Sequence, residues 1–527
     1  MQSYTMNAFF ILLSVIFTTH GQVYSQPKVI PINLQVVSDS AATGDGGNAW
    51  GGHQCRIVRT KEGVFTAYTV AVAGAGGIWD VKFYREWRLV KRTESGWKVI
   101  ASGLSGKDPV NLMASPDGIL YIVAWPGGNG TLWSCQLDGD TLAMSKERIP
   151  GVLKGDWPYN SAGIDSMGNI CVLSSEGGSE PGGSFLWSYL PAQQRQWISQ
   201  KTHLDYRYCY TYVFPHTDGS LSLVSTRDVL WEALGYQQPP GAFDYVFNAF
   251  RYWQTNDVNT PLQEMAYIEE PPTPEFPFVS CNAQIDAYID TKQNMHILYG
   301  VYGASTSGNW QRRHAVFSRQ GDLLYNGEIP LSAGWFCRIF QDVNERYFIL
   351  GDAGFVYLLA DDGYTPVDSV QFDLQGLKVE YSGFGVSVPR TGTPLSNTME
   401  VVFPTNEGKA WIYFSLALDE LFPLPLVVPD HQTIINRFEL FQNYPNPFNA
   451  ETIIRYKLAG QSDVMIKIYN ASGQQITALV NSVQQAGEYS VRWKGKDDHG
   501  QPVATGVYLV RLKAGDFTDM RKMLFIR

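Results

Sequence analysis

Charged side chains and long hydrophobic runs are both scarce in this chain of 527 residues. Charged residues make up 17% of it, against about 25% in a typical globular domain. No stretch approaches the 18 apolar residues that indicate a membrane-spanning helix. Zinc-ribbon and redox CxxC pairs, HExxH, GxSxG, P-loop and EF-hand patterns are all missing. We therefore expect no metal site, no cofactor and no transmembrane segment in the mature chain.

The longest apolar run, residues 8–17, reads AFFILLSVIF. Its length fits the central region of a signal peptide, and small residues before Gln26 offer a cleavage site. No Lys or Arg precedes the run, which is atypical, and a buried strand is the alternative. We predict that residues 1–25 are a signal peptide and that the protein leaves the cytoplasm of a bacterium through the periplasm.

Charge and cysteine are unevenly distributed along the chain. Residues 437–527 hold 12 Lys+Arg and 8 Asp+Glu, a balance of +4, so the remainder of a chain with net charge −10 carries −14. An acidic body does not attract a phosphate backbone, so nucleic acid is not expected as a partner. Export permits disulfides, but the cysteines lie within apolar runs, where we predict free, buried thiols. They are at positions 55, 135, 171, 209, 281 and 337.

An internal repeat organises most of the chain. Two apolar runs joined by a polar Gly/Asp/Asn turn recur, with turn centres near residues 62, 117, 167, 218, 292, 344 and 394. Five of the six intervals lie between 50 and 55 residues. A third run with an aromatic residue follows each pair, among them GTLWSCQL, SFLWSYL and DVLWEAL. Four short strands per repeat are typical of a propeller blade. We predict an all-β fold with a seven-bladed β-propeller at 28–420; an open solenoid or stacked sandwiches are the alternatives.

Three segments modify this ring. Residues 29–37 have no repeat of their own, and we predict that they supply the missing outer strand of the last blade. The one long interval, 74 residues, indicates an insertion within about 236–277, which holds seven prolines and forms either a functional flap or a plain surface loop. Three prolines within residues 421–436 indicate an extended linker.

The last ninety residues show short alternating runs with turns between them, which predicts a small β-sandwich over 437–527. NYPNPFN at 443–449, GVY at 506–508 and the tail RKMLFIR resemble the C-terminal sorting domain of the type IX (Por) secretion system. That family is similar in fold to the Ig-like domain of the flagellar hook-capping protein. The resemblance implies export across an outer membrane, removal of the domain, and release or surface attachment. An ordinary sandwich that stays attached is the alternative.

The hairpins weakly resemble the BNR-repeat and sialidase-like propellers, which include glycosidases and polysaccharide lyases acting on acidic glycans. Arg56-Ile57-Val58 lies where sialidases carry an Arg-Ile-Pro, but the Pro is missing, as are the repeated Asp boxes.

The candidate site follows from the ring itself. The inner strands of a propeller begin at one mouth of the channel, so residues at those positions are expected to converge. Tyr and His transfer protons and Arg neutralises a uronate carboxylate, as eliminative cleavage requires. The proton-transfer candidates are His53, Tyr159 and Tyr208; the substrate-binding candidates are Arg56, Arg207, Arg338, Trp157 and Trp335. A structural role between blades is the alternative for each.

Two functions are open on this basis. One is a secreted polysaccharide lyase or glycoside hydrolase acting on an acidic or complex glycan. The other is a non-catalytic surface propeller that binds a glycan or a protein. We expect a monomer that meets the type IX machinery through 437–527.

Overall fold

The computed structural model has two compact units, Met1–Pro423 and Leu424–Arg527, and each is considered by itself. It describes residues 28–41, 48, 51–72, 85–139, 141–153, 160–177, 181–238, 240, 244–269, 286–302, 310–329, 336–380, 383–405, 409–424, 438–443, 446–449, 451–485 and 487–526. The predicted signal peptide and most of the predicted linker lie outside these ranges. None of the helices described is long and apolar enough to span a membrane.

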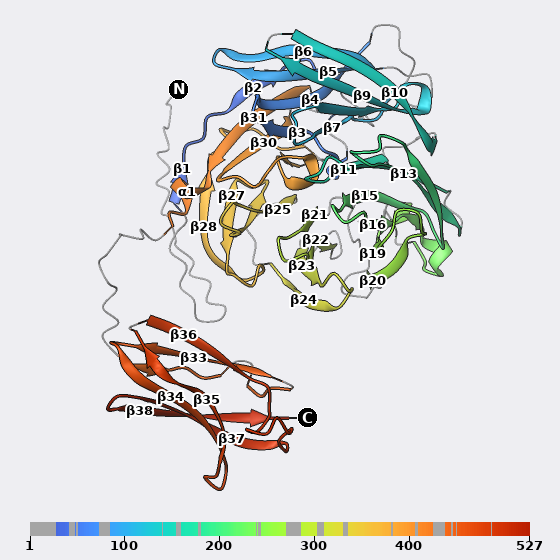
Figure 1. The fold of residues 1–527 in the computed structure, drawn as a ribbon. Coiled ribbons are helices and arrows are strands. Elements are labelled where there is room, and N and C mark those ends of the chain that lie inside the picture. Colours follow the sequence, from blue (N-terminus) through green and yellow to red (C-terminus); the bar gives the residue numbers. More distant parts are fainter. Residues whose placement is uncertain are drawn as a thin grey trace, which may run out of the picture. The chain divides into compact units, whose positions relative to one another are not determined.

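The first unit is built from four-stranded antiparallel sheets that lie around a common centre (Figure 1). Sheet 1 contains β3 (Ile57–Thr60), β4 (Gly63–Ala71), β5 (Arg85–Thr93) and β6 (Gly96–Ser105). Sheet 2 contains β7 (Asn111–Ala114), β8 (Leu120–Ala124), β9 (Asn129–Asp138), preceded by η1 (Pro126–Gly128), and β10 (Thr141–Leu153). Sheet 3 contains β11 (Asn160–Ile164), β12 (Ile170–Glu176), β13 (Gly183–Leu190) and β14 (Ile198–Leu204).

The pattern continues through the second half of the unit. Sheet 4 contains β15 (Tyr208–Pro215), β16 (Leu221–Arg227), β19 (Ala249–Thr255) and β20 (Gln263–Glu269). Sheet 5 contains β21 (Asp286–Ile289), β22 (Met295–Tyr302), β23 (Trp310–Phe317) and β24 (Leu323–Glu328). Sheet 6 contains β25 (Cys337–Gln341), β26 (Tyr347–Gly351), β27 (Phe355–Leu359) and β28 (Pro366–Phe372). Sheet 7 contains β29 (Gly385–Val386), β30 (Thr398–Thr405) and β31 (Ala410–Ala417), with η3 (Pro389–Thr391) between the first two and α1 (Leu418–Leu421) after the last.

The polar turns seen in the sequence join the first two strands of each repeat. In sheet 3, Asp165 Oδ1 accepts the Asn169 N–H at 2.9 Å, and Gly168 takes the left-handed conformation with φ of 88°. In sheet 6, Asp342 Oδ1 accepts the Arg346 N–H at 2.9 Å in the same way. An acidic side chain that bonds to the backbone two to four residues further on stabilises such a turn. The repeat therefore consists of a recurring type of turn, stabilised by an acidic side chain, as well as of two apolar strands.

The chain's N-terminal segment joins two sheets. β2 (Gln35–Ser38) pairs antiparallel with β31 as the outer strand of sheet 7, with Gln35 opposite Tyr413. This confirms the predicted outer strand for its second half. β1 (Lys28–Ile30) instead adds to sheet 6 as a fifth strand, parallel to β28. The N-terminal segment thus connects sheets 6 and 7, and its two strands cover the outer edges of both sheets.

The insertion predicted within 236–277 begins earlier in the chain than expected. β19 and β20 fall within that range and are ordinary strands of sheet 4. The extra residues precede them and include β17 (Val229–Leu230), η2 (Trp231–Leu234) and β18 (Tyr245–Val246), and β17 and β18 pair as a separate two-stranded sheet. The aromatic run DVLWEAL predicts the third strand of this sheet, but AFRYWQT holds that place.

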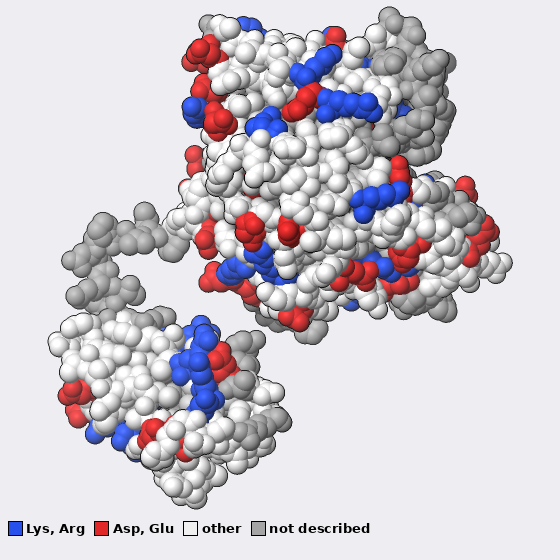
Figure 2. Space-filling view, turned by 45° about the vertical axis from the view of Figure 1, so that its right-hand side comes forward, with Lys and Arg blue, Asp and Glu red and all other residues white. Residues whose placement is uncertain are grey.

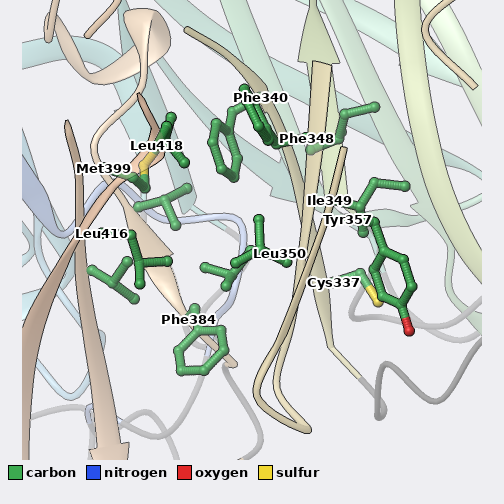
Figure 3. Close-up of a cluster of buried hydrophobic side chains, with 14 of the residues drawn as sticks. Cys337, Phe340, Phe348, Ile349, Leu350, Tyr357, Phe384, Met399, Leu416 and Leu418 are labelled. Atoms are coloured by element: carbon green, nitrogen blue, oxygen red, sulfur yellow. The ribbon is translucent and has the colours of Figure 1, made fainter. Parts of the chain in front are cut away.

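Buried apolar side chains fill the spaces between neighbouring sheets. Figure 3 shows one such cluster, in which Phe348 and Leu350 from sheet 6 lie near Leu416 and Met399 from sheet 7. The described cysteines, at 55, 135, 171, 209 and 337, are buried and free, which confirms that prediction for five of the six. Cys281 lies outside the described residues.

The second unit is a sandwich of two antiparallel sheets. One contains β32 (Glu439–Leu440), β33 (Thr452–Leu458) and β36 (Gly487–Trp493). The other contains, in order, β35 (Gln475–Gln484), β34 (Ser462–Asn470), β37 (Gly506–Ala514) and β38 (Phe517–Phe525). Alternate residues of both sheets bury a shared core that includes Ile454, Ile466, Trp493 and Val510.

Candidate functional site

Three of the predicted site residues meet in the centre of the first unit. Arg338 donates to the Gly52 carbonyl at 3.0 Å, and Arg56 donates to the Gly51 carbonyl at 3.2 Å. His53 follows directly, and its Nε2 lies 3.0 Å from the Asn160 carbonyl oxygen, where β11 begins. Arg56 and Arg338 each stand in the tripeptide Cys-Arg-Ile, at 55–57 and 337–339. Both guanidinium groups bind the same short segment, residues 51–52.

Sequence reasoning missed a fourth member, Arg390. It belongs to η3, in the degenerate seventh repeat, and donates to the His53 carbonyl at 2.8 Å and the Ala162 carbonyl at 3.1 Å. Its guanidinium carbon lies 5.0 Å from the ring centre of Tyr212. The signal in the sequence was a single Arg between Pro389 and Thr391, which no spacing rule distinguishes from a surface arginine.

Burial dominates the electrostatics of this cluster. It lowers the pKa of His53 to about 3, with the charges of Arg390, Arg56 and Arg338 acting in the same direction, although the bond to Asn160 opposes them. Burial, followed by the charge of Arg338, lowers the pKa of Arg56 to about 9. His53 is therefore neutral at physiological pH and cannot act as a cationic acid there.

One buried carboxylate faces the arginines. Asp286, at the start of β21, lies 3.8 Å from the Arg338 guanidinium, and its Oδ2 accepts the Ile339 N–H at 2.8 Å. Burial raises the pKa of Asp286, and the positive charge of Arg338 works against that rise. The void lined by Arg338, Asp286 and Arg390 holds about 20 Å³, room for one water molecule.

These contacts correct the predicted open mouth. His53, Arg56 and Arg338 are each less than 5% exposed and are engaged by backbone groups. Within the described residues the cluster packs the centre of the ring and forms no open cleft there. Residues 154–159, 270–285 and 330–335, which flank this end of the inner strands, lie outside the described part, as do the candidates Tyr159, Trp157 and Trp335.

Arg207 and Tyr208 do not join the cluster. Arg207 forms an ion pair with the buried Asp228 at 2.6 Å, which is a structural role. Tyr208 is packed between sheets, with its ring centre 4.9 Å from that of Trp253 and 6.4 Å from that of Phe185. Burial raises the pKa of Tyr208 well above its usual range, which makes it a poor base.

A larger cavity, of about 480 Å³, lies at the opposite ends of the inner strands. It is formed by the turns that follow β11, β15 and β21 together with η3. Its volume falls within the range of about 300–1,000 Å³ that ligand sites occupy. The polar side chains in its wall include Asp165, His216, Asp218, Asp290, Arg319 and Arg390.

The cavity wall is preorganised by hydrogen bonds within the turns. Arg319 donates to Asp218 at 2.6 Å and to Ser220 at 2.9 Å. His216 Nε2 lies 2.9 Å from the Ser222 hydroxyl, and burial lowers the pKa of His216 to about 4. Groups held in place in this way lose little conformational entropy when a ligand binds.

Asp290 extends from the same wall into the protein. Its Oδ2 accepts the Tyr347 hydroxyl at 2.8 Å and lies 3.1 Å from His296 Nε2, and His296 Nδ1 lies 3.0 Å from His314. Burial would raise the pKa of Asp290, but the bonds from His296 and the Asn294 amide outweigh it and hold the pKa at about 2. The described residues contain no group of three His, Cys, Asp or Glu arranged to hold a metal ion.

Comparison with known protein families identifies a domain in the second unit. Residues 447–516 match the FlgD Ig-like domain, so the chain carries this domain at its C-terminus. No curated protein matches the sequence.

Similar solved structures include PorZ, described as a surface component of the type-IX secretion system of Porphyromonas gingivalis, at 12% identity and a TM-score of 0.37. That comparison covers 92% of this chain and 60% of PorZ. The polysaccharide lyase Uly1 is similar at 11% identity and a TM-score of 0.45, over 74% of this chain and 100% of that one. An oligogalacturonate lyase from Vibrio parahaemolyticus is similar at 11% identity and a TM-score of 0.40, over 74% and 98%.

Proposed function

We propose that this is a bacterial cell-surface or secreted protein, delivered by the type IX secretion system, whose residues 437–527 are the sorting domain. One observation carries the proposal. The separate pieces of the sorting signature meet at one place in the second unit, where Asn446 Oδ1 accepts the Leu524 N–H at 2.8 Å. The ring of Phe448 lies 4.9 Å from that of Phe525, and Trp493 lies 5.0 Å from Tyr508. The signature and the basic-apolar tail thus form a single structural element.

Deletion tests the export role. A chain ending before Arg437 should accumulate in the periplasm with its first unit folded, whereas the full chain reaches the surface or medium. Cell fractionation with limited proteolysis of the retained protein measures both. Normal export of the truncated chain would rule out the sorting role.

For the first unit we propose a seven-bladed propeller that binds an acidic or complex glycan without cleaving it. The support is the preorganised cavity at the turns, together with the seven sheets of four or five strands in the described part of the first unit. Binding is favoured over catalysis because His53 is buried and neutral and Tyr208 is packed between sheets, so two of the three predicted proton-transfer groups lack access to a substrate. A protein ligand is the alternative occupant.

A blocking variant tests the binding proposal. Thr217 is exposed in the cavity wall, so Thr217→Trp should abolish retention on acidic polysaccharides while leaving the fold intact. Glu62→Trp, in the exposed β3–β4 turn away from the cavity, is the matched control and should bind normally. Absorbance of an unsaturated product during incubation with the same polysaccharides would instead establish a lyase.

A further inference from the structure

The outer face of the four-stranded sheet in the second unit concentrates positive charge. Strand alternation places Ile466, Val510 and Met523 in the core, so the residues between them point outward. In register across β34, β37 and β38, Lys467 lies opposite Arg511, and Leu509 lies opposite Lys522. We call the outward side chains of these three strands the basic face; its cations are Lys467, Arg511, Lys513 and Lys522.

Among the residues that the structure describes, the cations of this face have no carboxylate partner. Ion pairs in the second unit join Arg492 to Glu451 and Arg521 to Asp519, and none of the described ion pairs includes a cation of the basic face. Asp463, near the start of β34, is an acidic residue on the outward side of these described strands. Figure 2 shows both basic and acidic side chains on the visible face of this unit.

Apolar side chains lie among the cations. Met520 is 52% exposed and pairs across the strands with Arg511, and Met465 pairs with Lys513. The guanidinium of Arg511 lies 4.8 Å from the ring centre of Tyr469. A surface that combines unpaired cations with exposed methionine favours a partner that offers both negative charge and an apolar layer.

We propose that the basic face docks on an anionic phospholipid membrane surface. Three of its four cations are lysines, which are depleted in the cores of protein interfaces, where arginine and aromatic residues are enriched. Lysine acts as a point charge and suits a diffuse layer of headgroups, whereas bidentate recognition of a carboxylate favours arginine. The proposal rests on the face itself and does not depend on the sorting role.

Vesicle binding of the full mature chain tests it. Co-sedimentation with phosphatidylcholine vesicles containing about 30% phosphatidylglycerol, at about 0.1 M salt, is compared with pure phosphatidylcholine. We expect binding only to the anionic vesicles and its loss at about 1 M salt. Each cation near an anionic surface strengthens partitioning roughly fivefold, so K467Q/R511Q/K513Q/K522Q should weaken it at least 50-fold.

A matched variant separates this face from overall charge. R455Q/K457Q/K494Q/K496Q removes the same number of cations from elsewhere in the unit and should weaken partitioning less than tenfold. Both variants must keep the wild-type unfolding midpoint. If the basic-face variant unfolds, Lys513→Gln and Lys522→Gln, both at exposed positions, are tested singly for an approximately fivefold loss each.

Equal binding to both vesicle types, or equal loss in both quadruple variants, would overturn the proposal. A variant that is no longer exported, while the wild type ignores vesicles, would point to an acidic protein partner and also overturn it. Export of the chain lacking 437–527 is a separate measurement, so failure of the sorting proposal is recognised independently.

Discussion

Arg338 connects three segments at the centre of the first unit. Its guanidinium donates to the Phe384 carbonyl at 2.6 Å and the Gly52 carbonyl at 3.0 Å, and it faces the buried Asp286. Arg338→Ala removes these bonds and leaves a buried carboxylate without its counter-charge. We expect a loss of about 3 kcal/mol in the free energy of unfolding, measured by denaturant titration.

An exposed ion pair in the same unit provides the control. Arg88 and Glu86 lie 2.9 Å apart with both side chains about one-third exposed, so Arg88→Ala should change stability by no more than about 1 kcal/mol. Similar losses in the two variants would contradict the role given to Arg338.

Single residues also mark the limit of what the sequence could predict. The tripeptide Cys-Arg-Ile occurs at 55–57 and again at 337–339, and the arginines of both copies donate to neighbouring carbonyls, those of Gly51 and Gly52. Tyr208 does not line the channel as predicted, because its position at the start of a strand does not determine which side of the sheet its side chain faces. β15 is irregular between Cys209 and Tyr212, and Tyr210 takes a φ of 55°. One displaced residue in a strand reverses the face of its neighbours.

At the scale of strands and turns, prediction was most successful where local chemistry decides the structure. The predicted turn centres fall within the observed hairpins, since an Asp side chain and a left-handed residue are enough to build such a turn. Sheet 4 differs from the prediction because β17, η2 and β18 separate its second strand from its third, and an aromatic run within that segment matches the strand pattern. The two aromatic runs differ in the strands with which they pair: β19 pairs with β16, whereas β17 pairs with β18.

The strands β1 and β2 allow a test of ring closure. A chain beginning at residue 39 lacks both, which removes the parallel partner of β28 and the outer partner of β31. We expect a lower unfolding midpoint, with a stability loss on the order of 1 kcal/mol for each backbone hydrogen bond removed. A chain beginning at Pro27 is the matched control. Equal thermal unfolding of the two chains would show that the ring closes without these strands.

At the scale of the whole molecule, the two units differ in charge and in the origin of their cores. Residues 1–436 carry a net charge of −14 and residues 437–527 a net charge of +4, and this difference follows from composition alone. The hydrophobic cores are also separate, because each cluster of buried residues contains side chains of one unit alone. The cluster of the second unit lies between Leu440 and Phe525 in the sequence, and those of the first unit lie between Ile32 and Phe422. The sequence predicted this division from the prolines near residue 425.

Separate cores predict separate unfolding. Trp493→Ala removes a buried ring that contacts Phe448 and Tyr508, and should destabilise the second unit by about 3–5 kcal/mol. The heat-capacity trace of the full chain should contain two transitions, and this variant should lower only the one that disappears when residues 424–527 are deleted. The remaining transition should keep its midpoint, since distant sites without shared partners contribute additively. If the substitution shifts both transitions together, the units are energetically coupled, and a sorting domain that can be removed without disturbing the propeller is excluded.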